Sequence, residues 1–165
     1  MRGSAPAWLA LCVACGLAGP AAARETLGVF DGWAAFRDNG AAPRCYAIAA
    51  PLRAGGASSW RPFASVGTWP ARGARGQVHI RLSRARDPRS AVTLSVGERR
   101  FELLAARGDA WAPDPRADAA IVGAMRGARS MSVETVSAGG RPFADVYALA
   151  GAATAIDAAA LACRS

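Results

Sequence analysis

The stretch that decides the fold runs from Phe143 to Cys163 and reads FADVYALAGAATAIDAAALAC. An apolar segment of strand length leads into an alanine-rich segment. The second segment repeats one set of residues at spacings of four, three and four: Ala152, Ile156, Ala159 and Cys163. Such spacing places side chains on one face of a helix. The sequence therefore predicts a strand followed by a C-terminal helix that directs its cysteine inward.

The strand in this stretch is apolar on both sides. Phe143, Tyr147 and Leu149 form a large-residue side, and small residues form the other side. A strand of this kind is covered on both sides, and we expect the C-terminal helix to pack on the small-residue side. Asp145 lies among the large residues, so its carboxylate is expected to accept hydrogen bonds or to pair with an arginine.

The first 23 residues have the pattern of a secretory signal peptide. Arg2 supplies a positive start, Ala5 to Leu17 is almost entirely apolar, and Ala21 to Ala23 offers small residues for cleavage. The apolar run is shorter than the roughly 20 residues that a spanning helix needs. We therefore expect a periplasmic or secreted protein, with outer-membrane association as a further option, and one mature domain over residues 24–165 without a transmembrane segment.

Export changes the interpretation of the four cysteines. Cys12 and Cys15 lie within the signal peptide, and lipidation of Cys15 is the alternative to cleavage after the small residues. Cys45 and Cys163 remain, and an even pair in an oxidising compartment predicts a disulfide. Two free or metal-binding thiols are the alternative, although neither cysteine has a neighbouring histidine or CxxC partner.

The mature domain is strongly basic. Without Arg2 its formal net charge is +7, and every basic residue apart from the single histidine is an arginine. A basic surface favours anionic partners such as lipopolysaccharide or acidic glycans. The arginines are scattered and form no basic helix, and export argues against nucleic acid as a partner.

Alternating apolar and polar residues between turn signals predict about eight strands. They lie at 29–37, 44–51, 62–69, 77–84, 91–96, 101–105, 130–137 and 143–150. One internal helix is expected after Asp114, which can cap it, with Pro115 in its first position. We therefore predict an all-β single domain, a β-sandwich or flattened barrel, with one short internal helix and a C-terminal helix.

Residues suited to catalysis are sparse. His79 is the only histidine and stands on the polar side of a predicted strand, so a hydrolytic site would have to be built around it. The sequence offers two carboxylate pairs, Asp114 with Asp118 and Asp145 with Asp157. Asp114 is explained as a helix cap and Asp118 as compensation of the helix dipole. The second pair has no such structural explanation from the sequence. No phosphate-binding loop, cofactor motif or metal-ligand cluster is apparent. We expect a protein without enzymatic activity, cofactor or metal.

Aromatic and arginine residues bracket the predicted strand 62–69. They are Trp60, Arg61, Trp69, Arg72 and Arg75. In loops, such side chains can contact sugars or lipid phosphates. We treat these five residues as the predicted partner-binding rim.

Seven short segments follow one another along the mature chain: Phe30-Asp31-Gly32-Trp33, Arg44 to Pro51, Val66 to Pro70, Ala110-Trp111, Ile121 to Gly127, Ser130 to Val133 and Asp145 to Gly151. Their order and spacing, together with the closing helix and Cys163, resemble the invasion associated locus B family of exported bacterial proteins. The resemblance implies a β-rich periplasmic or outer-membrane-associated domain with no defining catalytic motif. It also implies a role at the cell surface or in contact with a host.

The expected function is that of an exported, non-enzymatic envelope protein that binds another envelope protein or an anionic surface molecule such as lipopolysaccharide. Two alternatives stay open. One is a periplasmic enzyme that uses Asp145 or His79 in a cleft. The other is a structural accessory protein without a ligand of its own.

Overall fold

A computed structural model describes residues 24–56 and 61–164 of the chain. Its strands form one antiparallel sheet of ten members in the order β1-β2-β3-β4-β5-β8-β7-β6-β9-β10. The strands are β1 (Arg24–Phe30), β2 (Trp33–Asp38), β3 (Arg44–Ala49), β4 (Phe63–Trp69), β5 (Ala74–Arg81), β6 (Val92–Val96), β7 (Arg99–Ala106), β8 (Asp109–Trp111), β9 (Ser130–Val136) and β10 (Pro142–Ala148). The helices are the single 3-10 turn η1 (Pro70–Arg72), α1 (Pro115–Gly127) and α2 (Ala152–Ala162).

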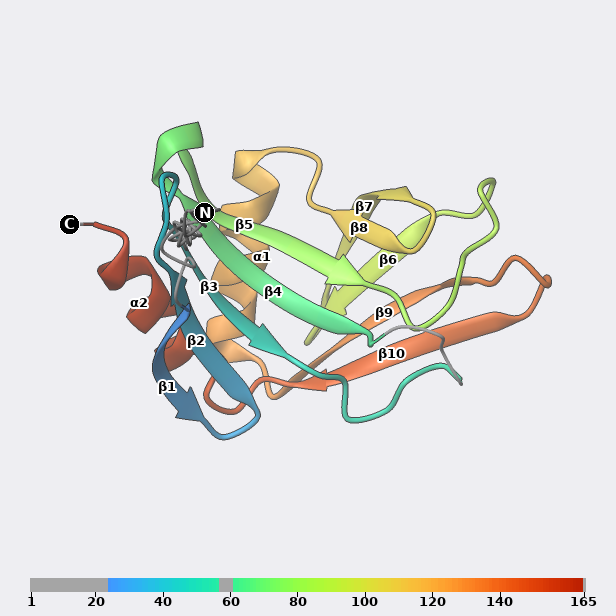
Figure 1. Ribbon diagram of the computed structural model, residues 1–165. Coiled ribbons are helices and arrows are strands. Elements are labelled where there is room, and N and C mark those ends of the chain that lie inside the picture. Colours follow the sequence, from blue (N-terminus) through green and yellow to red (C-terminus); the bar gives the residue numbers. More distant parts are fainter. Residues whose placement is uncertain (1–23, 57–60, 165) are drawn as a thin grey trace, which may run out of the picture.

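The predicted all-β class is confirmed. The sheet is not closed into a barrel, and β6, β9 and β10 form a layer apart from β1 to β5 (Figure 1). Side chains from both parts belong to one buried core, as Ile80 of β5 and Leu94 of β6 illustrate. The arrangement fits a sandwich, with the two predicted helices present.

The described chain has ten strands, two more than the sequence predicts. The segment predicted as one strand at 29–37 is two strands, because Asp31 and Gly32 form a tight turn between β1 and β2. Asp31 adopts a φ of 50°, and Asp-Gly is a pair that favours this kind of hairpin turn. The other additional strand, β8, is three residues long, which is too short to produce a period-two pattern.

Helix α1 follows β8 in the chain and packs beside β5. Asp114 caps the helix by accepting a hydrogen bond from the backbone N–H of Ala117, and Pro115 takes the first position, as predicted. Strand β8 pairs only with the last three residues of β5, so the backbone N–H of Val78 lies beyond it. Asp118 of α1 accepts that N–H at 2.7 Å. Burial raises the pKa of the Asp118 carboxyl despite this hydrogen bond.

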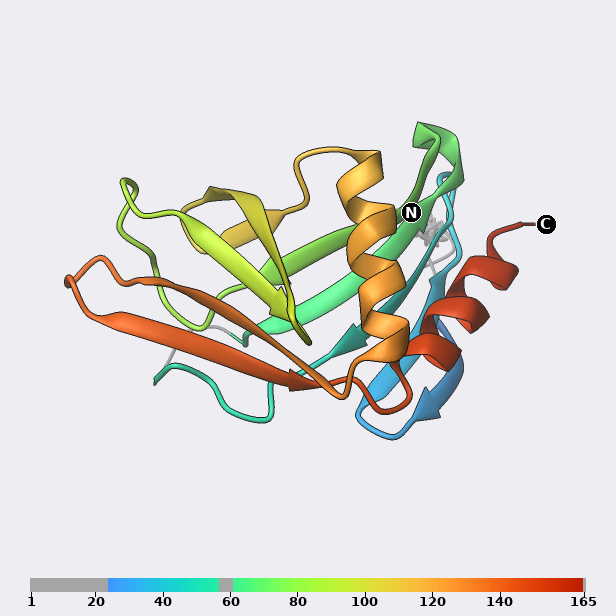
Figure 2. The same cartoon turned by 180° about the vertical axis from the view of Figure 1, so that it is seen from behind.

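Helix α2 packs on β1 to β4, which corrects the expectation that it covers the small-residue side of its own strand, β10. Viewed from behind in Figure 2, α1 and α2 lie on the same side of the β1 to β5 layer. The inner faces of the strands carry Ala35 and Ala47, and α2 presents Ala155 and Ala159, all of them buried. Small residues on both surfaces allow the helix to approach the strands closely.

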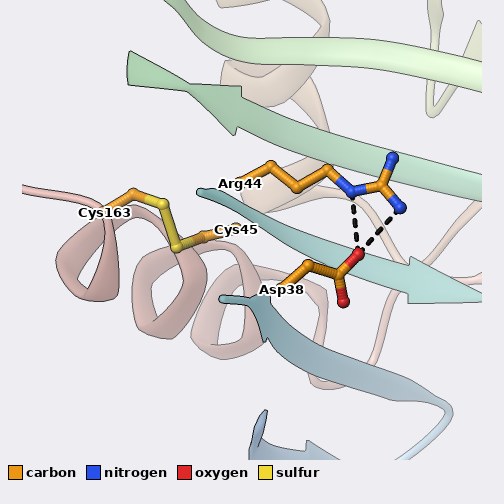
Figure 3. The surroundings of a disulfide bond; sticks show 4 residues. All are labelled: Asp38, Arg44, Cys45 and Cys163. Atoms are coloured by element: carbon orange, nitrogen blue, oxygen red, sulfur yellow. Dashed lines mark hydrogen bonds and ion pairs between the residues drawn. A yellow bond between two sulfur atoms is a disulfide. The ribbon is translucent and has the colours of Figure 1, made fainter. Parts of the chain in front are cut away.

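The predicted disulfide between Cys45 and Cys163 is confirmed, with an S–S distance of 2.03 Å and a Cα–Cα distance of 5.8 Å. It joins the end of α2 to β3 across 118 residues of sequence. Figure 3 shows Cys45 turned toward α2, while Arg44 beside it points to the opposite side of the strand and meets Asp38. Strand β3 thus has a helix-bound inner face and a separate outer face. None of the described helices is long and apolar enough to cross a membrane.

Candidate functional site

The outer side of the β1 to β5 layer, opposite the helices, carries many aromatic and charged groups in mutual contact. No described element lies in front of β3, β4 and β5 in Figure 1. Strand alternation places one set of side chains here, which we term the aromatic–arginine face: Arg24, Phe36, Asp38, Arg44, Tyr46, Ile48, Phe63, Trp69, His79, Arg81, Asp109 and Trp111.

One end of the face is an ion-pair cluster centred on Asp38. The Nε atoms of Arg24 and Arg44 each lie 2.8 Å from a different oxygen of the Asp38 carboxylate. The hydrogen bond from Arg24 is the main reason why the pKa of Asp38 lies below its ordinary value, and Arg44 adds to it. Two guanidinium groups share one carboxylate, so this end retains a positive charge.

Aromatic rings lie directly beside these guanidinium groups. Phe36 and Tyr46 are cross-strand partners with ring centroids 5.7 Å apart. The guanidinium carbon of Arg24 lies 5.6 Å from the Phe36 ring and 5.7 Å from the Tyr46 ring, and that of Arg44 lies 5.5 Å from Tyr46. Cation–π attraction orients both arginines along the sheet surface.

The opposite end of the face is built around His79. Its imidazole stacks on Trp111 of β8 at 5.1 Å and meets the edge of Phe63 at the same distance. The Nε2 atom of His79 lies 2.8 Å from Asp109, which also accepts two hydrogen bonds from Arg81. Burial raises the pKa of Asp109, but the hydrogen bonds from Arg81 and His79 outweigh it and the pKa is lowered.

Trp69 connects the two ends. A Cβ atom on Gly67 would come within 2.3 Å of the Trp69 indole, so the ring lies flat along the strand in the space that glycine leaves. Arg24, Arg44, Tyr46, Phe63, Trp69 and His79 line an open groove of about 340 Å³. A second hollow of about 470 Å³ at the β2–β3 turn shares Arg24 and Arg44 with the groove. The concave surface is therefore continuous from the turn to His79.

The face suits an acidic ligand with apolar surfaces of its own. Arg24, Arg44 and Arg81 outnumber the carboxylates of Asp38 and Asp109, so the face is net positive without any contribution from His79. Guanidinium groups form paired hydrogen bonds to carboxylates and phosphates, and aromatic rings pack on apolar C–H groups. Among the described residues, no group of three or more histidine, cysteine, aspartate or glutamate side chains could hold a metal ion.

The predicted rim does not gather at one place. Trp60 lies outside the described residues, and Arg61 is exposed just before β4 begins, at the opposite end of that strand from Trp69. Arg72 is exposed on η1. Arg75 of β5 lines a small hollow beside α2, on the helix side of the sheet. Among the four members that the structure describes, Trp69 alone belongs to the aromatic–arginine face.

The carboxylates singled out from the sequence have structural partners. Asp145 is fully buried and accepts backbone hydrogen bonds from Gly55 and Ser83 at 2.7 and 2.8 Å. Asp157 pairs with Arg126 at 2.6 Å, linking α2 to α1. Asp114 caps α1, and Asp118 of α1 accepts the backbone N–H of Val78 in β5. Of the two residues considered for catalysis, only His79 reaches a concave surface.

Most of the aromatic–arginine face was not predicted from the sequence. Phe36 and Tyr46 alternate with buried residues along their strands, and this alternation was the available signal. It places each residue on an outer side without showing which strands adjoin. Comparison with known proteins adds no further guide, since no family model, curated protein or solved structure matches the chain.

Proposed function

We propose that the protein is an exported, non-enzymatic envelope protein that binds an acidic surface glycan, such as the charged sugars of lipopolysaccharide, on its aromatic–arginine face. Export is supported by the pattern of the first 23 residues and by a disulfide of the kind that persists in oxidising compartments. Membership of the invasion associated locus B family, as the seven segments suggest, is part of the same proposal.

The observation that carries the proposal is the groove in which Trp69, Tyr46 and Phe63 lie among arginines. A sugar ring has apolar C–H faces that pack on aromatic rings, and its acidic substituents accept hydrogen bonds from guanidinium groups. The groove is open along the sheet, which suits a chain-like ligand better than a small enclosed one. A protein partner with an acidic surface segment is the second candidate for the same face.

The test must distinguish binding at this face from nonspecific attraction to the net positive charge of the domain. The protein, with its disulfide intact, is passed over immobilised lipopolysaccharide and eluted with a salt gradient, alongside neutral dextran and the sugar-free polyanion polyacrylate. We expect retention on lipopolysaccharide that weakens as salt screens the charges. Absence of salt-sensitive retention, or equal retention on polyacrylate, would count against the proposal.

Matched variants locate the binding surface. Arg44→Ala removes one guanidinium from the face and is expected to weaken binding about tenfold. Arg116→Ala removes the same charge from an exposed position of α1 and should leave affinity unchanged. Equal effects of the two variants would assign binding to net charge alone.

A third variant tests the aromatic part. Gly67→Ala places a methyl group where the Trp69 indole lies, so the ring must leave the sheet surface. We expect affinity to fall about fivefold through lost ring packing. The salt dependence should stay that of the unaltered protein, because no charge is removed.

An enzymatic role is less well supported. Asp145 is enclosed and both of its oxygens are occupied. His79 faces the groove, but the one hydroxyl beside it on the neighbouring strand, that of Ser65, donates to the backbone carbonyl of His79 at 3.3 Å. No described nucleophile is therefore hydrogen-bonded to the His79 ring.

A further inference from the structure

A second concave surface lies beyond the Arg81 end of β5, between the β7–β8 turn and the segment 85–88. It has a volume of about 700 Å³, roughly twice that of the groove on the aromatic–arginine face. Its lining includes Ala85, Arg86, Pro88 and Arg107, with Arg81 and Asp109 at its border with that face. We term it the Arg107 hollow.

Arg107 stands in an unusual backbone conformation at this hollow. It forms the β7–β8 turn with Gly108 and has a φ of 54°, a region that disfavours arginine and favours glycine or asparagine. The turn is fixed from outside, because the backbone N–H groups of Leu82 and Arg86 donate to its two carbonyl oxygens at 2.7 and 3.4 Å. Arginine is disfavoured in this conformation, and its side chain lines a hollow. The two observations together point to a role for that side chain.

The charge on Arg86 is held in the wall of the hollow. Its guanidinium group donates to the carbonyl oxygens of Asp87, Ser90 and Ala105 at 2.7 to 2.8 Å. These acceptors are neutral, so they fix the group without cancelling its charge. The Asp87 carboxylate, the nearest in sequence, pairs with Arg89 instead.

Arg107 supplies free donors. No described residue forms an ion pair or side-chain hydrogen bond with its guanidinium group, and its side chain is exposed. Arg81 uses its Nε and one terminal nitrogen to bind Asp109, which leaves its other terminal nitrogen available. Three arginines against one carboxylate give the lining a formal charge of +2.

We infer that the Arg107 hollow binds a phosphate monoester. Such a group carries a charge close to −2 at neutral pH, which matches the lining, whereas a carboxylate would balance only half of it. Guanidinium groups form paired hydrogen bonds with phosphate oxygens. Ala85 and Pro88 offer an apolar wall for the organic part of the ester. Arg81 and Asp109 belong to both surfaces, but Arg86 and Arg107 lie outside the aromatic–arginine face, so a variant of Arg107 tests this inference separately from the proposed glycan binding.

Calorimetric titration with phenyl phosphate tests the inference on the disulfide-bonded protein. We expect saturable binding at one site, and binding of benzoate weaker by about tenfold because its single charge balances half of the lining. No binding of phenyl phosphate, or equal binding of benzoate, would overturn the phosphate assignment. Phenol serves as the uncharged control and is expected not to bind.

Arg107→Gly is the decisive variant. It removes the guanidinium group and supplies the residue that the turn conformation favours, so the protein should fold at least as well. We expect the affinity for phenyl phosphate to fall by about tenfold or more. Arg72→Ala, at the opposite end of β5, removes the same charge and should have no effect. Unaltered binding by Arg107→Gly, or an equal loss in Arg72→Ala, would refute the site.

Sedimentation with vesicles distinguishes the source of the phosphate. Arg107-dependent binding to phosphatidylcholine vesicles that contain phosphatidic acid, and not to phosphatidylcholine alone, would identify a lipid headgroup as a ligand. Binding of phenyl phosphate without binding to either vesicle would identify a soluble ester. Either result supports the phosphate site.

Discussion

The Oδ2 atom of Asp145 accepts a hydrogen bond at 2.8 Å from the backbone N–H of Ser83, a residue 62 positions earlier in the chain. Its Oδ1 atom accepts one at 2.7 Å from Gly55, 90 positions earlier. The buried carboxylate thus joins β10 to the segments that follow β5 and β3. These two backbone partners explain how the buried carboxyl group is accommodated between Phe143 and Tyr147.

Replacing Asp145 should therefore destabilise the fold. Asp145→Ala leaves two backbone N–H groups without partners in the interior, and we expect the free energy of unfolding to fall by about 3 kcal/mol. Urea denaturation measures the loss. Asp157→Asn breaks the exposed ion pair with Arg126 and should cost less than about 1 kcal/mol. Equal losses in the two variants would contradict the assigned role of Asp145.

The disulfide is expected to contribute substantially to stability. Replacing both Cys45 and Cys163 by alanine opens a loop that covers most of the described chain, and we expect the free energy of unfolding to fall by about 2 to 5 kcal/mol in denaturant titrations. Intact mass after alkylation without reduction should show neither of these two thiols modified in the unaltered protein. An unchanged denaturation midpoint in the double variant would mean that packing alone holds α2.

Short sequence patterns predicted those parts of the fold that interactions between residues close in sequence determine. Asp114 and Pro115 mark the start of α1 because a cap and a proline act within one helical turn. Val92, Leu94 and Val96 are all buried as their alternation predicts. Cys163, the residue directly after α2, packs against the core as its spacing from Ile156 and Ala159 predicts.

The remaining features depend on contacts between distant segments. The spacing in α2 defines an apolar face but does not say which strands it covers, and the matching alanines of β2 and β3 lie over a hundred residues away. The cluster of Phe63, His79 and Trp111 exists because β4, β5 and β8 are neighbours in one register. No single segment of the sequence determines this strand order.

Replacement of two glycines by alanine should change the free energy of unfolding in opposite directions. Gly151 begins α2 with a φ of 79°, and a Cβ atom there would lie 2.0 Å from the backbone oxygen of Phe30. We expect Gly151→Ala to lower the free energy of unfolding by about 2 kcal/mol or more, because both strain and the backbone contact oppose it. Gly123 of α1 has open space around it, and Gly123→Ala should raise stability by about 0.5 to 1 kcal/mol. Thermal and urea unfolding of the two variants, measured together, check both signs.

The pairing of Asp109 with Arg81 and His79 should make part of the stability depend on pH. The pKa of Asp109 is lower in the folded protein than its ordinary value of 3.8, so its contribution is fully present above about pH 4. That contribution is lost as the pH falls through the lowered pKa. We expect the unaltered protein to exceed Asp109→Asn in unfolding free energy by up to about 1 kcal/mol at pH 6, and the difference to shrink toward zero at about pH 2.

Urea titrations of both proteins at several pH values give this difference directly. Glu102→Gln, on an exposed position of β7 without an ion pair to any described residue, controls for the general loss of negative charge. Its difference from the unaltered protein should vary little over the same range. A difference for Asp109→Asn that stays constant or grows on acidification would mean that Arg81 and His79 do not stabilise the ionised carboxylate. The His79 end of the aromatic–arginine face would then need another explanation.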